Sequence, residues 1–229
     1  LFFRMKNCIL LLILTSFSNV SLGQIYEVGI SLGGSNYAGD IGRTSYIYPN
    51  KLGGAAFFKY NKNPRMALRA TYSYLPIKAN DLDADTDFRR VRRLNFKNTI
   101  NELAVGLEYN FYEYDVSTPG KTWTPFILLE FAAFNYKYIT SETAPDQYEY
   151  NSKNSFAIPF GVGFKSKLSG SFAFALETKF RYTFEDNLDY NSEKIAKLNF
   201  GGTGNDWYMF TGFSLIYTFG RPACYANGL

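Results

Sequence analysis

The sequence contains no histidine among its 229 residues. Without an imidazole the chain cannot form a serine–histidine–acid triad, and it lacks the commonest neutral metal ligand. No glycine-rich phosphate loop follows a predicted strand and opens a helix, so the sequence offers no nucleotide-binding motif either. A carboxylate pair could still perform acid–base chemistry, but no pair stands out from the others. We therefore expect a protein that is not an enzyme and that needs no metal or cofactor.

Cysteine is almost as scarce, with only Cys8 and Cys224 in the chain. Cys8 precedes the apolar N-terminal stretch instead of following it, which argues against a lipid-modified cysteine. If the N-terminal region is removed, Cys224 has no intramolecular partner. In an oxidising compartment a single cysteine is a candidate for an intermolecular disulfide or a free thiol, and an incidental thiol on a frayed end is the alternative.

Long apolar runs are absent beyond the N-terminal region, so we expect no membrane-spanning helix. The compact apolar stretch at 9–14 follows Arg4 and Lys6 and precedes small residues at 21–23. This order is typical of a secretory signal, which is too short and wrongly flanked for a membrane anchor. We expect residues 1–23 to comprise a few upstream residues and a signal peptide that is cleaved.

Neither sign of charge dominates the remaining chain. Its length is 229 minus 23, or 206 residues, and it keeps 24 minus 2, or 22, basic residues against 20 acidic ones. A net charge of 22 minus 20, or +2, argues against nucleic-acid binding as a main role. The length suits a single domain.

Aromatic residues are abundant, with 19 Tyr and 22 Phe in the chain. They alternate with small or polar residues, and the segment 172–184 shows the pattern best: Phe, Leu and Tyr predominate on one parity, and Ala, Glu, Lys and Arg on the other. Because successive side chains of a strand point to opposite faces, this predicts a strand with one apolar and one charged face. In a soluble barrel the apolar face would be inside; in an exported membrane barrel it faces lipid.

The same alternation predicts eight strands, at residues 26–37, 52–61, 66–75, 96–112, 124–139, 156–168, 172–184 and 206–219. The connections at 61–65 and 167–171 are tight, the one at 112–123 is intermediate, and the long polar ones lie at 38–51, 76–95, 140–155 and 185–205. Short turns at one end and long loops at the other are typical of bacterial outer-membrane barrels. We predict an all-β fold, an eight-stranded antiparallel transmembrane β-barrel of the outer membrane over 24–219. The even strand count places both termini in the periplasm.

Charged residues fall on the parity opposite to the aromatic one. An eight-stranded barrel has an interior just wide enough for side chains to fill. Since buried charges must be paired and the two signs are similar in number, we predict a salt-bridge network that plugs the lumen. A narrow ion path is the alternative. The predicted luminal residues are Arg69, Glu102, Glu108, Glu130, Glu177, Lys179 and Arg181, and Lys59 and Lys165 share their parity.

The run RRVRR at 89–93 concentrates positive charge in one predicted loop. Such a run could bind lipopolysaccharide phosphates or an acidic partner surface. We favour a solvated loop with internally balanced charge, because four aspartates directly precede the run: Asp81, Asp83, Asp85 and Asp87.

A tail at 220–229 follows the predicted closing strand. Pro222 cannot extend a ladder, so the strand ends before it. With its strands placed, the chain resembles the PorG-like outer-membrane proteins of the type IX secretion system of Bacteroidetes, a system often tied to gliding motility. The stretches that carry the resemblance are 27–40 (EVGISLGGSNYAGD), 58–74 (FKYNKNPRMALRATYSY), 95–111 (NFKNTINELAVGLEYNF), 124–126 (TPF), 158–165 (IPFGVGFK), 175–188 (ALETKFRYTFEDNL) and 205–219 (NDWYMFTGFSLIYTF).

The resemblance implies a structural role, an outer-membrane anchor or scaffold that docks a periplasmic ring made of a PorK-like lipoprotein and a PorN-like partner. It also implies that Cys224 corresponds to the family's terminal cysteine and pairs with the ring lipoprotein. We expect further partner contacts from the neighbouring tail residues Arg221, Pro222 and Tyr225. The alternatives are a small passive channel and a soluble secreted barrel, and the outward aromatics on all eight strands argue against the latter.

Overall fold

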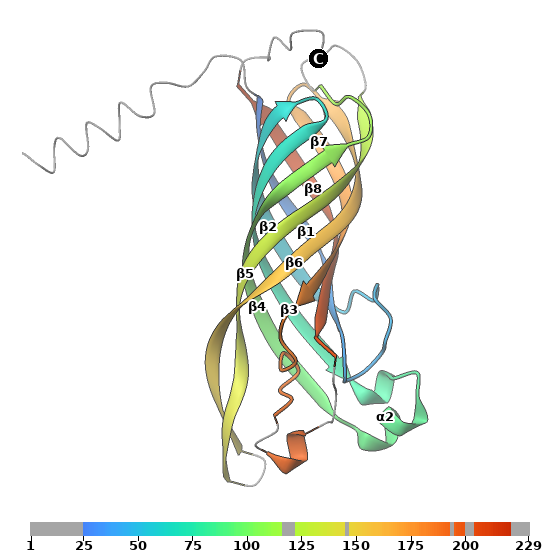
Figure 1. Cartoon of the computed structure of the whole chain (residues 1–229). Coiled ribbons are helices and arrows are strands. Elements are labelled where there is room, and N and C mark those ends of the chain that lie inside the picture. Colours follow the sequence, from blue (N-terminus) through green and yellow to red (C-terminus); the bar gives the residue numbers. More distant parts are fainter. Residues whose placement is uncertain (1–24, 116–121, 145–146, 193–194, 200–203, 221–229) are drawn as a thin grey trace, which may run out of the picture.

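The computed structural model describes residues 25–115, 122–144, 147–192, 195–199 and 204–220. Eight strands form its framework: β1 (Ile25–Ala38), β2 (Lys51–Asn63), β3 (Met66–Asn80), β4 (Asn95–Asn110), β5 (Trp123–Ala144), β6 (Gln147–Ser169), β7 (Phe172–Thr183) and β8 (Trp207–Phe219). Consecutive strands pair antiparallel, and β8 pairs with β1 from Tyr26–Phe219 to Ala38–Trp207. The sheet is therefore a closed barrel, and the prediction of eight antiparallel strands is confirmed (Figure 1).

The two ends of the barrel differ in their connections. At the end that we call the short-turn end, β2 joins β3 through two residues, and the Asn63 side chain accepts hydrogen bonds from the backbone N–H groups of Arg65 and Met66 at 2.9 and 2.7 Å. The β6–β7 turn there contains Gly170 at φ +54°, a backbone angle that residues with a side chain rarely adopt. The opposite, long-loop end carries the connections 39–50, 81–94 and 184–206 and the tip of the β5–β6 hairpin (Figure 1).

The β5–β6 hairpin extends well beyond the other strands (Figure 1). Segment 140–155, which the sequence predicts as a long polar loop, is strand on both sides of the tip, so that prediction is wrong. The ladder continues through Ile139–Tyr150 and Ser141–Glu149 to Ala144–Gln147, with register irregularities on the way. Beyond the wall most residues of these strands are exposed, although Ile139 and Tyr148 pack against the connection between β7 and β8. Residues 140–155 are therefore mostly polar on both parities, and the alternation that marks a strand is lost.

The sequence predicts that the connection between β3 and β4 begins at Pro76, but β3 continues to Asn80. It is followed by a short 3-10 turn, η1 (Asp81–Asp83), and a single helical segment, α2 (Asp87–Arg92). A second 3-10 turn, η2 (Ala196–Leu198), lies between β7 and β8. Among the residues that the structure describes, no helix is long and apolar enough to cross a membrane.

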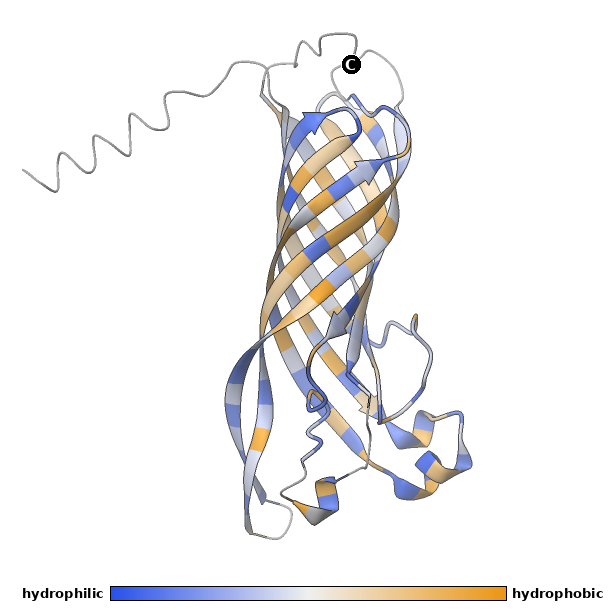
Figure 2. Cartoon of the chain, viewed as in Figure 1, coloured by the Kyte–Doolittle hydropathy of each residue, from blue (hydrophilic) through white to orange (hydrophobic). Residues whose placement is uncertain are grey.

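The wall of the barrel is apolar on its outer face. Large hydrophobic side chains are exposed there on every strand, for example Val28, Phe58, Leu68, Leu103, Leu129, Phe160, Phe172 and Leu215. We call this surface the apolar belt. Figure 2 shows hydrophobic and hydrophilic residues interspersed along the strands of the barrel, whereas the distal part of the β5–β6 hairpin is mainly hydrophilic. Fully buried residues include arginines and lysines. This distribution is the inverse of that in a water-soluble protein and matches a barrel whose wall faces lipid.

Candidate functional site

The lumen contains ten buried charged residues, five cations and five carboxylates, which we call the luminal charge network. Each of the ten is at most 3% exposed. Its members are Lys59, Arg69, Lys165, Lys179 and Arg181 with Glu27, Glu102, Glu108, Glu130 and Glu177. They come from seven of the eight strands, because every strand but β8 directs at least one charged side chain inward.

Near the short-turn end, Glu108 is the centre of the network. Its carboxylate lies 2.7 Å from Lys59 Nζ and 2.6 Å from Lys165 Nζ. Lys59 also lies 3.6 Å from Glu27, whose other oxygen accepts a hydrogen bond from the Asn61 amide at 3.0 Å. Two ammonium groups thus share one carboxylate, and a second carboxylate balances the excess charge.

In the middle of the lumen, Arg69 makes a bidentate ion pair with Glu177, at 2.8 and 3.0 Å. Its Nε also donates to the Thr71 hydroxyl at 3.2 Å. That hydroxyl donates to Glu130 at 2.8 Å, and Lys179 donates to the second oxygen of Glu130 at 3.0 Å. Hydrogen bonds therefore link the charges of β3, β5 and β7 across the interior.

Towards the long-loop end, Arg181 donates to both oxygens of Glu102, from Nε at 3.0 Å and from Nη2 at 3.1 Å. The Tyr208 hydroxyl donates to the same carboxylate at 2.7 Å. The Tyr208 ring then packs edge-on against Phe134. The charged layer thus passes directly into an apolar one.

Apolar clusters close the lumen on both sides of the charges. The cluster at the long-loop end includes Leu75, Ile100, Phe134, Tyr136, Tyr208 and Phe210. The cluster at the short-turn end includes Phe57, Tyr114, Phe126 and Ile216. Its rings also touch cations, since the Arg69 guanidinium lies 4.0 Å from the Phe57 ring centre and Lys165 Nζ lies 4.6 Å from that of Tyr114.

Two luminal glycines make room for these rings. A Cβ added to Gly29 would lie 2.2 Å from the Phe57 ring, and one added to Gly163 would lie 2.3 Å from the Phe126 ring. The strands opposite the two phenylalanines must therefore lack side chains at these points. The lumen is filled by complementary large and small residues as well as by ion pairs.

The seven residues that the sequence predicts for the lumen, Arg69, Glu102, Glu108, Glu130, Glu177, Lys179 and Arg181, all lie inside it and contact one another as described. Lys59 and Lys165, which share their parity, belong to the same network. Sequence reasoning missed Glu27, although its parity opposite Val28 and Ile30 is a signal that could have found it.

A second polar cluster closes the long-loop end around the Tyr37 hydroxyl. That hydroxyl contacts Asp206 and lies 3.0 Å from Asp189, while the backbone N–H groups of Leu188 and Asn191 donate to the two carboxylates at 2.9 and 3.0 Å. One hydroxyl can donate only one proton. Burial, together with repulsion from neighbouring carboxylates, raises the pKa of Asp189 to about 6 and also raises the pKa of Asp206.

The loop 81–94 is organised by Asp81, which is fully buried. Its carboxylate accepts hydrogen bonds from the N–H groups of Gly42 and Leu94, at 2.9 and 3.0 Å, and from Arg92 at 2.8 Å. Burial opposes ionisation, but these hydrogen bonds outweigh it and hold the pKa of Asp81 below its ordinary value.

The arginines of the basic run 89–93 bond both to their own loop and to the neighbouring loop 39–50. Besides Arg92, Arg89 donates to the carbonyl of Gly42 at 2.8 Å, and Arg90 pairs with Asp87 at 2.9 Å. Arg92 also donates to the carbonyl of Asp40 at 2.6 Å, so Arg89 and Arg92 fasten the loop 81–94 to the neighbouring loop 39–50. These contacts fit the balanced, solvated loop that we favour from the sequence, although part of the run is helical.

The predicted partner-binding residues Cys224, Arg221, Pro222 and Tyr225 lie outside the described residues, as does the predicted signal peptide. Within the described part of the chain, no group of three or more His, Cys, Asp or Glu side chains could hold a metal ion.

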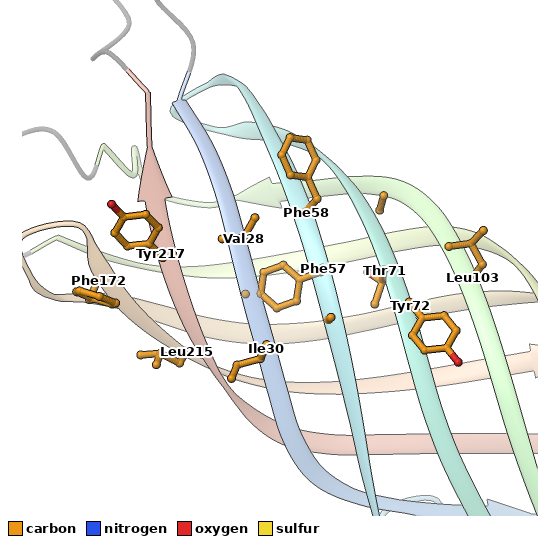
Figure 3. Close-up of a pocket in the computed structure, with 13 residues that line it drawn as sticks. Val28, Ile30, Phe57, Phe58, Thr71, Tyr72, Leu103, Phe172, Leu215 and Tyr217 are labelled. Carbon is orange, nitrogen blue, oxygen red and sulfur yellow. The ribbon is translucent and has the colours of Figure 1, made fainter.

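The outer wall carries a shallow apolar hollow of about 550 Å³ over β1, β2 and β3. Figure 3 shows Val28, Ile30, Phe58 and Tyr72 around it. The small side chain of Ala70 is part of its lining and leaves space between these larger ones. The hollow belongs to the belt that faces lipid.

Several solved barrels have a similar fold. The attachment invasion locus protein Ail of Yersinia pestis, in complex with the heparin analogue sucrose octasulfate, matches with 11% identity and a TM-score of 0.47, over 86% of this chain and 100% of Ail. The N-terminal β-barrel domain of Pseudomonas aeruginosa OprF matches with 13% identity and a TM-score of 0.47, over 86% of this chain and 98% of that one. A major outer membrane protein from Thermus thermophilus matches with 14% identity and a TM-score of 0.48, over 86% of this chain and 100% of that one.

The comparison with curated proteins gave no match. At the level of the family the result is clear, since one family's pattern covers residues 5–228. The chain is therefore a member of the family described as "Domain of unknown function (DUF6089)".

Proposed function

We propose that this protein is a non-enzymatic anchor or scaffold of the bacterial outer membrane that serves a protein secretion machine of the type IX, gliding-associated kind. The filled lumen is the observation that carries the proposal. Among the described residues, ion pairs and two apolar clusters occupy the interior, and they leave neither a solute path nor an open catalytic pocket through it. A barrel of this kind acts through its outer surfaces and its ends.

The short-turn end is the end that meets the periplasmic components in this proposal. The first residues of β1 and the last residues of β8 pair there, so both termini leave the barrel on that side. Short turns face the periplasm in bacterial barrels, which supports this orientation. The secretion machine itself is supported by the resemblance of the sequence to PorG-like proteins.

The tail 220–229 then makes the link to the ring. Fully extended, its ten residues reach at most roughly 33–36 Å, enough to touch a complex beneath the membrane. Cys224 forms a disulfide with the PorK-like lipoprotein, and Arg221, Pro222 and Tyr225 set the register of the contact with the ring and its PorN-like partner. The disulfide acts by raising the effective concentration of the tail at the ring.

The test is a non-reducing gel of membranes that contain wild-type protein, Cys224→Ser or the matched control Cys8→Ser. A reducible band of higher mass that only Cys224→Ser loses is the expected result. Wild type that runs only as a monomer, together with full secretion by Cys224→Ser, would overturn the disulfide.

A second measurement separates docking from the disulfide. Ring proteins should co-isolate with the barrel after gentle detergent extraction, and deletion of 221–229 should abolish this. If the ring co-isolates equally with the deleted chain, the tail is not the link. If no ring component co-isolates with wild type under conditions that keep the ring intact, the scaffold role is wrong.

A further inference from the structure

The wall of the barrel has a break at the long-loop end between β4 and β5. Their ladder ends at the pair Asn101–Asn135. Each strand stays paired on its other side beyond this point. β4 pairs with β3 as far as Asn95, and β5 pairs with β6 as far as Ala144. The two strands therefore separate over residues 95–100 and 136–144.

Two side chains occupy the positions that a regular ladder would fill with backbone hydrogen bonds. Asn98 donates to the carbonyls of Lys137 and Leu188 at 2.7 and 2.9 Å, and accepts from the N–H groups of Thr99 and Lys137 at 2.8 and 3.2 Å. The Tyr190 hydroxyl donates to the carbonyl of Lys97 at 2.7 Å. Because the buried Asn98 amide uses its full hydrogen-bonding capacity, the separation is a built feature of the wall.

A cavity of about 420 Å³ lies in this break. It is lined by the bridging residues Asn98 and Tyr190 together with Lys97, Thr99, Asn101, Asn135, Lys137 and Tyr150. Two of these residues are cationic, and none of the lining residues is acidic. The cavity is thus lined by groups that suit an anion bearing hydroxyl groups.

A third lysine adds to the positive charge. Lys78 on β3 lies directly opposite Lys97 on β4, so the two side chains share a face of the sheet. Within the described residues, neither these two lysines nor Lys137 has a carboxylate within 4.0 Å. Like charges directly opposite each other destabilise a strand pair, and a bound anion would remove that cost.

The break lies at the edge of the apolar belt. Along β4, the outward residue after Asn101 is Leu103, which is 60% exposed, and along β5 the exposed Phe131 lies on the same side two outward positions before Asn135. A ligand held by the lysines would therefore lie next to the apolar belt, on the side of the break that faces the short-turn end. This is the arrangement that a lipid requires, with its headgroup in the break and its acyl chains along the belt.

We propose that the break between β4 and β5 binds the phosphate-bearing sugar headgroup of a membrane glycolipid. Lys97 and Lys137 contact the phosphate from the two sides of the break, and Lys78 adds to the positive electrostatic potential there. The sugar lies against the Asn101 side chain, whose oxygen accepts from Tyr72, and the half-exposed Tyr150 ring. The acyl chains lie along the belt beside Leu103 and Phe131.

The test compares binding of three probes to the full chain in a non-ionic detergent: phosphorylated lipid A, the same lipid without its phosphate, and glucosamine 1-phosphate. The variants are Lys97→Gln/Lys137→Gln and, as a control, Lys62→Gln/Lys167→Gln, which removes the same charge at the short-turn end. Heat-modifiable migration on a gel shows that each variant is folded. We expect phosphorylated lipid A to bind wild type and the control equally, and the Lys97/Lys137 variant about tenfold or more weakly, because two charge-assisted contacts are lost.

Each other outcome overturns the proposal in its own way. Equal binding of phosphorylated lipid A by both double variants would show that the break is not the site. Equal binding of the lipid with and without phosphate would show that the phosphate does not contribute to recognition. Glucosamine 1-phosphate that binds as tightly as the lipid would identify a site for a free phosphosugar, and the lipid commitment would be wrong.

Discussion

A charged side chain has different effects on stability on the two faces of the barrel wall. Leu107 lies in the middle of the outward apolar row of β4 and is 48% exposed. Leu107→Arg should destabilise the barrel in lipid by about 2–4 kcal/mol, because a guanidinium near the bilayer midplane loses its hydration. Thr140→Arg, on the exposed part of the β5–β6 hairpin, is the matched control and should change stability by less than about 0.5 kcal/mol. Urea unfolding in lipid vesicles measures both, and equal costs would contradict the assignment of the belt.

On the inner face, charge is tolerated only in pairs. Arg181→Met leaves Glu102 buried with only the Tyr208 hydroxyl as a close partner, and should cost about 3–5 kcal/mol. Arg181→Met/Glu102→Leu removes both charges and should cost less than the single change. The two unfolding free energies, measured under one set of conditions, test this. A double variant less stable than the single one would show that the pair is not coupled as its geometry indicates.

Among the elements, the connection between β7 and β8 responds to pH through Asp189 and Asp206. Their pKa values are raised in the folded protein, so the folded state binds more protons than the unfolded state over that range. Stability from this cluster is present below about pH 4, the ordinary aspartate value, and is lost as pH rises through about 6 for Asp189 and about 8 for Asp206. Asp40 and Asp186 face the same cluster and act in the same direction.

Asp206→Asn should therefore stabilise the closed loop by about 1–3 kcal/mol at pH 8 and change little at pH 4. The protection factor of the Leu188 amide, which donates to Asp206, reports the closure directly. Asp83→Asn, an exposed aspartate in another loop, serves as the control. Protection in wild type that increases between pH 5 and pH 8 would contradict the sign.

For the whole molecule, the filled lumen predicts a barrel that does not conduct. Wild-type protein in a planar bilayer should give no steady single-channel current, because charged and apolar layers leave no continuous water path. Arg69→Ala/Glu177→Ala removes the central bidentate pair and should allow brief openings. Steady conductance from the wild type would restore the passive channel as the better function.

The strand period made much of this architecture predictable. Because outward and inward residues alternate strictly, parity alone identified the eight strands and the seven predicted luminal charges. It failed for the distal β5–β6 hairpin, where most residues are exposed and polar on both parities and no alternation remains. It also could not reveal Asn98 between β4 and β5, since its contact with Leu188 joins residues 90 apart in the sequence. The tail around Cys224 has no repeating pattern from which a structure could be inferred.

The way in which the charges are paired also bears on how the barrel assembles. The luminal ion pairs of 3.0 Å or less join strands that are not neighbours in the wall: β2 and β6 to β4, β3 to β7, β5 to β7, and β4 to β7. A hairpin that entered the bilayer alone would therefore carry unpaired charge into a medium that penalises it. Two longer pairs do join neighbouring strands, Lys59–Glu27 at 3.6 Å and Arg69–Glu108 at 3.3 Å, but the closer pairs form only when the sheet curls. Stepwise insertion of single hairpins is therefore disfavoured. Partly closed barrels should accordingly be too short-lived to accumulate during refolding into vesicles.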